Sequence, residues 1–304
     1  MPASGRGTAN RSVLAGTLCV LLAAIGFSAK AILIKLAYAY PVDAATLLTL
    51  RLSFSAPFFA LMALWSKRDA NPLSRRQWLG VVFLGFSGYY LASYLDFLGL
   101  AYITAGLERL ILFLHPTLVV LMSAWWLRKP IRSHHFVALA LSYGGIALVF
   151  TENLNFGAYA HEVVLGGALV FASGVIYAFY LIGAGEIVGK IGAMRFTAYA
   201  MLVACLACML QFRVTHDLRA LIVPAQVYWL TFAMAIISTV IPAWLMSEGI
   251  RLTGANHAAM VGSVGPVATI FLGYWFLGEP ITLVQTTGAA LVLAGVALVS
   301  SRPA

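Results

Sequence analysis

The stretch PTLVVLMSAWWLRKPI at residues 116–131 reappears in outline 150 residues later, as PVATIFLGYWFLGEPI at residues 266–281. Each copy begins with a proline, carries a tryptophan at its tenth position and ends in Pro-Ile. Between these landmarks both copies are mostly apolar, and a helix that crosses a bilayer needs about 20 such residues. The pair therefore predicts two equivalent membrane-spanning helices, one in each half of a duplicated chain.

The same spacing holds over a longer stretch, because residues 94–150 align with residues 244–300 without a gap. Glycines on this offset pair Gly16 with Gly166, Gly99 with Gly249, and Gly145 with Gly295. Each half holds five predicted helices, and since five is odd, the second half begins on the opposite side of the membrane. Inverted repeats of this kind place a binding site near the midplane and work by alternating access. The repeat therefore favours transport over a structural membrane role.

Composition supports the same class of protein. Of 304 residues, 62% are hydrophobic and 10% are charged, whereas a soluble domain carries roughly 25% charged residues. We expect an all-α polytopic membrane protein whose ten transmembrane helices form a 5+5 inverted repeat around a central cavity. The predicted spans are 13–38, 44–66, 76–99, 105–127, 133–151, 162–184, 194–212, 227–249, 257–277 and 282–300. The predicted divisions are an N-terminal tail (1–12), a first repeat (13–151), a second repeat (162–300) and a C-terminal tail (301–304).

The basic residues predict the orientation. With ten spans, thirteen Lys and Arg residues fall on the side that holds both termini, and only Arg213 and Arg219 fall on the other. Cytoplasmic loops carry the excess of Lys and Arg in membrane proteins. Both termini are therefore expected in the cytoplasm, with the chain in the inner membrane of a bacterium. The same short clusters account for the net charge of +9, so no nucleic-acid partner is expected.

Enzyme, cofactor and metal chemistry find little support in the residues. His161-Glu162 is not followed by a second His at zincin spacing, and no Walker, dinucleotide or nucleophile-elbow pattern is present. Cys19, Cys205 and Cys208 lie in apolar runs, where small packing residues are expected. The sequence thus predicts no cofactor, no metal site and no catalytic residue.

Several short motifs resemble one family of membrane transporters. They are Gly106-Leu107-Glu108-Arg109-Leu110 leading into Leu114-His115-Pro116, Gly278-Glu279-Pro280 closing the second half, and Arg51 in the second span. On these motifs the chain resembles the EamA branch of the drug/metabolite transporter superfamily over nearly its whole length. The resemblance implies a 5+5 fold, a central cavity and often export of amino acids, with the family's aromatic amino-acid exporters as the suspected match. One position departs from the family pattern, because Lys129 stands before Pro130 where the family commonly has Glu.

Lys30 is the most informative candidate for substrate binding. It lies past the middle of the first span, where an ammonium group costs roughly 2.5–3.5 kcal/mol on insertion scales. Such a charge is expected to face a wet cavity or an acid. Two explanations stay open: Lys30 attracts the carboxylate of an amino-acid-like substrate, or it snorkels toward the interface or forms a structural ion pair.

Other aromatic and polar side chains are expected at a similar depth, where they would stack on a substrate or hydrogen-bond to it. These candidates are Tyr89, Tyr90, Tyr94, His115, Tyr177, Tyr180, Trp244 and Ser263. Ordinary packing within the membrane is the alternative for each of them. For His115 a role in proton movement is also open.

Two groups of residues are candidates for gating. Pro116 and Pro266 each free a backbone carbonyl one turn earlier, so they are expected to kink helices that line the cavity, with helix packing as the alternative. The outer ends of the first four spans hold a balanced set of charges, which is expected to be either a structural clamp or a periplasmic gate. These charges are Lys35, Asp43, Arg51, Asp96, Glu108 and Arg109.

The predicted function is export of small metabolites, with amino acids (aromatic ones included) as the expected substrates. The expected partners are a small-molecule substrate and the lipid bilayer; the oligomeric state stays open, and a monomer is compatible with the sequence. The alternatives are a multidrug or cationic-compound exporter of the same superfamily, a membrane channel, or a membrane-embedded enzyme. Proton coupling is not predicted, because the first span carries no carboxylate, and this favours a facilitative carrier.

Overall fold

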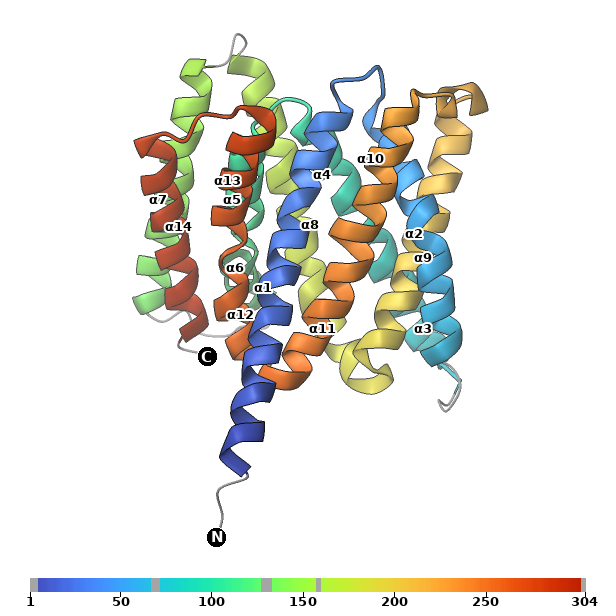
Figure 1. The fold of residues 1–304 in the computed structure, drawn as a ribbon, viewed down its shortest axis with the longest axis horizontal. Coiled ribbons are helices and arrows are strands. Elements are labelled where there is room, and N and C mark those ends of the chain that lie inside the picture. The colour runs from blue at the N-terminus through green and yellow to red at the C-terminus, as the bar shows by residue number, and fades with distance from the viewer. Residues whose placement is uncertain (1–4, 67–71, 127–132, 157–159, 302–304) are drawn as a thin grey trace.

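The computed structural model describes residues 5–66, 72–126, 133–156 and 160–301, and all regular secondary structure in these ranges is helical (Figure 1). Long apolar segments form helices because a bilayer offers no water to the backbone, so each peptide group must be satisfied within its own segment. The elements are α1 (Gly5–Ala37), α2 (Ala44–Ser66), α3 (Arg75–Leu84), η1 (Gly85–Leu91), α4 (Ala92–Leu100), α5 (Ala105–Leu112), α6 (His115–Trp126), α7 (Ser133–Phe156), α8 (Ala160–Ile191), α9 (Ala193–Thr215), η2 (Leu218–Leu221), α10 (Ala225–Ala235), η3 (Ile236–Val240), α11 (Ile241–Thr253), α12 (Ala255–Gly262), α13 (Gly265–Leu277) and α14 (Leu283–Ser301).

The predicted spans are found as helices. Within the described ranges, nine helical segments are long and apolar enough to cross a membrane, and Leu283–Val299 forms a shorter apolar tenth. The sixth span is longer than predicted, since α8 continues to Ile191. Both termini lie at the same end of the bundle (Figure 1). We call this end the termini side and the opposite end the far side.

The irregular segments of the two halves fall at equivalent places. The third span passes through the π-helix η1 and the eighth passes through the π-helix η3, which the 150-residue offset superimposes. The fourth span breaks between α5 and α6, and the ninth breaks between α12 and α13, in each case just before the paired prolines. Since π-helices are rare, their occurrence at repeat-equivalent positions supports the duplication of the fold.

The paired glycines explain how the halves are built. Gly99 and Gly166 face each other where α4 crosses α8, and a Cβ on Gly99 would lie 2.8 Å from the Gly166 carbonyl oxygen. Gly16 and Gly249 face each other where α1 crosses α11, and a Cβ on Gly249 would lie 3.1 Å from the Gly16 carbonyl oxygen. The two crossings are equivalent, because Gly16 corresponds to Gly166 and Gly99 corresponds to Gly249 in the repeat. Small residues permit this close approach of backbones, on which helix association in membranes depends.

The two ends of the bundle are packed differently. Toward the far side, α4 packs against α2 and α1, and α5 packs against α1 and α13. The repeat-equivalent pairs toward the termini side are α11 with α9 and α8, and α12 with α8 and α6. None of these pairs has a comparable interface in the described part of the chain. The bundle is therefore closed at the far side and looser at the termini side.

The turn between the first two spans is held by Asp43, which caps α2. Its Oδ1 accepts hydrogen bonds from the backbone N–H groups of Ala45 (2.8 Å) and Thr46 (3.0 Å), and its Oδ2 accepts one from the Thr46 hydroxyl at 2.7 Å. Partial burial alone would raise the pKa of the Asp43 carboxyl, but these bonds outweigh it and hold the pKa below its usual range. The ionised cap thus stabilises the fold above a pH of about 4, the pKa of an unfolded Asp, and this stabilisation disappears as the pH falls through the lowered folded pKa.

We expect Asp43→Ala to lower the stability of the protein by about 0.5–2 kcal/mol at neutral pH, because the cap is lost. Thermal unfolding in detergent at neutral and acidic pH measures the effect, and the difference from wild type should shrink on acidification. Asp43→Asn is the control, since Asn also caps a helix but does not titrate. Equal losses at neutral pH in both variants would contradict the capping role.

Candidate transport site

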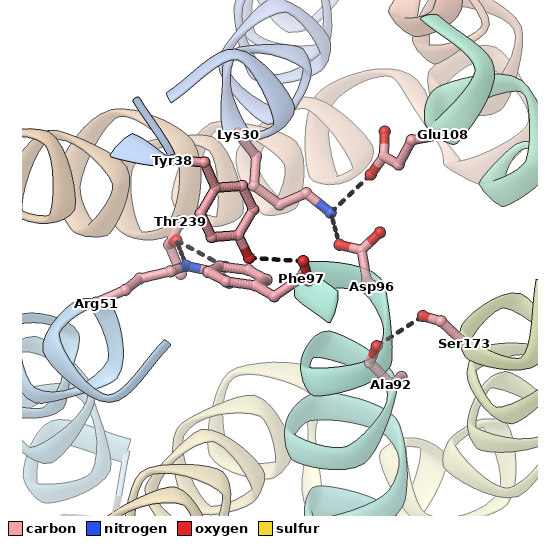
Figure 2. Close-up of polar contacts among 9 residues, drawn as sticks. All are labelled: Lys30, Tyr38, Arg51, Ala92, Asp96, Phe97, Glu108, Ser173 and Thr239. Carbon is pink, nitrogen blue, oxygen red and sulfur yellow. Dashed lines mark hydrogen bonds and ion pairs between the residues drawn. The ribbon is translucent and has the colours of Figure 1, made fainter. Parts of the chain in front are cut away.

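An ion cluster joins three spans in the half of the bundle nearer the far side. The Lys30 ammonium of α1 lies 2.5 Å from Asp96 Oδ2 of α4 and 3.2 Å from Glu108 Oε1 of α5 (Figure 2). The side chains of Asp96 and Glu108 are 3% and 0% exposed, and that of Lys30 is 17% exposed. The structure therefore shows Lys30 in an ion pair, and attraction of a substrate carboxylate by Lys30 stays a prediction. We call these three residues the Lys30 cluster.

The surroundings of the Lys30 cluster are polar and come from further spans. Arg51 of α2 donates from Nε and Nη2 to the Thr239 hydroxyl of η3, at 3.1 and 3.0 Å, and its guanidinium lies 5.5 Å from the centre of the Phe97 ring. The Tyr38 hydroxyl donates to the Phe97 carbonyl at 2.6 Å (Figure 2). Arg51 thus binds the π-helix of the second half, which ties the two halves together beside the cluster.

The six charges predicted at the outer ends do not form one network. Lys35 donates to the carbonyls of Ile103 at 2.9 Å and Leu100 at 3.4 Å, where it satisfies the C-terminal end of α4. Asp43 lies 3.4 Å from the ring of His216, the residue that follows the C-terminal end of α9. Lys30 was not among these six charges, yet it is the residue that contacts both Asp96 and Glu108.

Four aromatic side chains gather beside the break in the fourth span. Tyr89 lies in η1, His115 begins α6, and Tyr177 and Tyr180 come from α8. The rings of Tyr89 and Tyr180 are 5.0 Å apart with their hydroxyls hydrogen-bonded at 3.0 Å, Tyr177 stacks on Tyr180 at 5.4 Å, and His115 lies 5.9 Å from Tyr177. These four residues, which we call the aromatic group, combine apolar faces with hydroxyl and imidazole donors and acceptors.

Arg109 lies between the Lys30 cluster and the aromatic group. It follows Glu108 on α5 and is within electrostatic range of Tyr177 and His115. The end of its side chain contacts the backbone of α13, since a Cβ on Gly265 would lie 2.8 Å from Nη2. Its Nε is buried without a hydrogen-bond partner in the described structure, while the residue as a whole is only partly buried. Arg109 is thus a cation at the break of two spans whose hydrogen-bonding capacity is not filled.

The remaining candidates are not part of the aromatic group. Tyr90 and Tyr94 stack on each other at 6.3 Å and pack into the core beside α2. Trp244, the repeat equivalent of Tyr94, is 63% exposed on α11. The Ser263 hydroxyl donates to the Met260 carbonyl of its own helix turn at 2.6 Å. Pro116 and Pro266 stand at the first turns after the two breaks, where the missing N–H is tolerated.

Two residues with clear roles were not among the predicted site residues. Thr239 anchors Arg51, as described above. Glu279 accepts hydrogen bonds from the backbone N–H groups of Ala105 at 2.9 Å and Gly106 at 3.3 Å, so a carboxylate of the second half caps α5 of the first. The sequence carried one signal for Glu279, because its repeat-equivalent position holds Lys129 and not Glu. Lys129 itself lies outside the described residues. The described residues also contain no group of three or more His, Cys, Asp or Glu side chains arranged to hold a metal ion.

The fold and the buried polar site together define a multi-pass helical membrane transporter built from two inverted five-helix halves. A sequence model described as the EamA-like transporter family matches the chain twice, over residues 14–151 and 164–301. The chain therefore belongs to the EamA-like transporter family, within the drug/metabolite transporter superfamily.

Individual relatives agree with this class. The chain is 32% identical over 289 residues to "Uncharacterized transporter YcbK" of Bacillus subtilis (strain 168), covering 91% of this chain and 90% of the relative. It is 24% identical to "Uncharacterized transporter sll1319" of Synechocystis sp., covering 94% and 93% of the two chains. A protein of known crystal structure has a TM-score of 0.63 to this one at 18% identity, over 93% of this chain and 95% of its own, which shows the shared fold.

Proposed function

We propose that this transporter exports amino acids or closely related metabolites, aromatic ones included, across the inner membrane of a bacterium, with both termini in the cytoplasm. The orientation rests on the excess of basic residues at the termini side. The termini side is then the cytoplasmic side and the far side is the periplasmic side. The substrate binds between Arg109 and the aromatic group, at the breaks of the fourth and ninth spans.

The unfilled hydrogen-bonding capacity of Arg109 is the observation that carries the substrate assignment. Lys30 is already paired with two carboxylates, so it has little charge left for a substrate anion. A guanidinium presents a planar set of donors that matches a carboxylate. Tyr177 and His115, beside Arg109, offer ring faces for an apolar or aromatic side chain.

The difference between the two ends of the bundle supports alternating access. The far side is closed by helix contacts and by the Lys30 cluster, whereas the equivalent helix pairs at the termini side form no comparable interface among the described residues. The repeat supplies the second conformation by exchanging the roles of the halves. The Lys30 cluster then serves as the periplasmic gate, and this conformation admits substrate from the cytoplasm.

We expect Arg109→Gln to raise the substrate concentration for half-maximal transport by tenfold or more, because a charge-assisted hydrogen bond in a dry site contributes about 1.5–3 kcal/mol. Counterflow of radiolabelled amino acids in proteoliposomes, with wild-type and variant protein reconstituted at equal amounts, measures this. Arg213→Gln, at the exposed end of α9, is the matched control and should transport as the wild type does.

Three outcomes separate the alternatives. Saturable amino-acid counterflow that weakens only in Arg109→Gln supports both the substrate and the site. Equal transport by both variants removes Arg109 from the substrate path and leaves the carrier. Counterflow of cationic compounds with none of amino acids would replace the substrate class while the transporter fold stands.

A further inference from the structure

The Lys30 cluster contains two carboxylates and one ammonium group, and only one of the carboxylates lies in close contact with the ammonium. Asp96 takes the shorter contact, and Glu108 reaches the same nitrogen at 3.2 Å (Figure 2). Asp96 Oδ1 and Glu108 Oε2 are buried and have neither a hydrogen bond nor an ion pair within the described residues, and Glu108 Oε1 has only its ion-pair contact with Lys30. A buried acceptor without a donor costs about 1–3 kcal/mol, and more when it is charged. The side chain of Glu108 is 0% exposed, so water does not relieve this cost.

Other charged groups around the cluster do not supply the missing donor. Arg51 of α2 is bonded to Thr239 instead, and Lys35 of α1 is bonded to backbone carbonyls. Arg109 of α5 lies beyond ion-pair distance of either carboxylate and is turned toward Gly265 of α13. Tyr38, directly after α1, is within electrostatic range of Asp96, but its hydroxyl donates to the Phe97 carbonyl. Tyr177 of α8 is within electrostatic range of Arg109.

A single proton would resolve the arrangement. Bound to a free oxygen of either carboxyl, it changes that oxygen into a donor and leaves one carboxylate against one ammonium. Two carboxyl groups that share a buried site bind one proton far more tightly than an isolated carboxyl does. Both carboxyl groups contact the same Lys30 ammonium (Figure 2). Because the two groups interact, the proton belongs to the pair and not to one residue alone.

We propose that Asp96 and Glu108 form a proton-binding site that holds one proton while the far side is closed and releases it to water when that side opens. Opening separates α4 and α5 from α1 and hydrates both carboxylates, which removes the reason to keep the proton. The transport cycle is thereby linked to proton movement at the periplasmic gate. The absence of a carboxylate from the first span does not prevent this, because the third and fourth spans bring two carboxylates to Lys30.

Proton linkage fixes the direction of the pH effect. Since the closed state binds one proton more than the open state, the ratio of open to closed protein rises with pH, by up to tenfold per pH unit. A variant without a titrating group at position 108 loses this dependence.

Infrared difference spectroscopy of the purified protein in lipid, titrated by pH, tests for the bound proton without any substrate. We expect the C=O absorption of a protonated buried carboxyl in wild type and in the control Glu162→Gln, whose side chain is exposed. The absorption should be lost in Glu108→Gln, persist in Glu108→Asp, and titrate at a different pH in Asp96→Asn. An absorption that survives in Glu108→Gln, or that is missing from folded wild type at every pH, would overturn the proposal.

Labelling from the far side tests the link to opening. Single cysteines are introduced into a protein without its native cysteines. Tyr94→Cys places a thiol on α4 deeper than the cluster, as seen from the far side. Val214→Cys, at a position 86% exposed on α9, is the control for the reactivity of the thiol itself. The ratio of the two labelling rates by a membrane-impermeant maleimide should rise with pH and become constant in Glu108→Gln. A constant ratio in the wild type would contradict the linkage. Both readouts are independent of amino-acid transport, so they distinguish failure here from failure of the proposed function.

Discussion

Lys30→Met is expected to lower the stability of the folded protein by about 3–5 kcal/mol and to abolish transport. The substitution removes the ammonium from between Asp96 and Glu108 and leaves two buried carboxyl groups without a cation. Breaking a buried ion pair from one side costs this much because the remaining charge cannot be hydrated. The midpoint of unfolding in mixed detergents, followed by tryptophan fluorescence, and counterflow in proteoliposomes measure the two effects.

The cluster predicts a ranking that a general packing defect would not produce. Glu108→Gln leaves Lys30 paired with Asp96 and should cost less than 1 kcal/mol, because the amide resembles the protonated acid and the closest contact stays intact. Asp96→Asn removes the closer partner and should fall between the two. The combined Lys30→Met, Asp96→Asn, Glu108→Gln protein should recover most of the stability lost in Lys30→Met alone, since no unpaired charge remains. Equal losses in Lys30→Met and Glu108→Gln would contradict this account of the cluster.

Gly166→Val is expected to lower stability by about 1–3 kcal/mol and to reduce the yield of folded protein sharply. A Cβ at this position would lie 2.9 Å from the Gly99 carbonyl oxygen and 2.7 Å from the Cβ of Tyr102. Neither atom is the free end of a flexible side chain, so α4 and α8 must separate, and overpacking of this kind carries that cost. Because α4 also carries Asp96, separation of the two helices should weaken the Lys30 cluster as well.

Gly185→Ala on the same helix is the matched control. A Cβ on Gly185 meets nothing within 4 Å, and alanine favours the helix over glycine by about 1 kcal/mol. The control should therefore equal or exceed wild type in the same unfolding experiment. A Gly166→Val protein as stable as the control would show that the close crossing of α4 and α8 is not required.

Most of the architecture was predictable because it depends on one-dimensional properties of the chain. Span length follows from the number of consecutive apolar residues, and the repeat follows from prolines and glycines on a constant offset. The structure explains why glycines recur on that offset. Gly16 faces Gly249 and Gly99 faces Gly166, so the same close helix crossing occurs once for each half. The paired π-helices had no comparable signal, because they depend on one extra residue in a turn and not on composition.

The partners of each charge were decided only by the tertiary structure. The spans are apolar around most of their circumference, so residue spacing does not reveal which face meets which helix. Asp96 and Glu108 are 66 and 78 residues from Lys30 in the chain, and only the packing of α4 and α5 against α1 brings the three together. The sequence by itself determined that buried charges must exist in this membrane protein and that two inverted halves enclose them. Which charge pairs with which, and which cation keeps an unbonded nitrogen, follows from how the helices rotate and cross. The physical reason is that charges attract each other strongly in a low-dielectric interior.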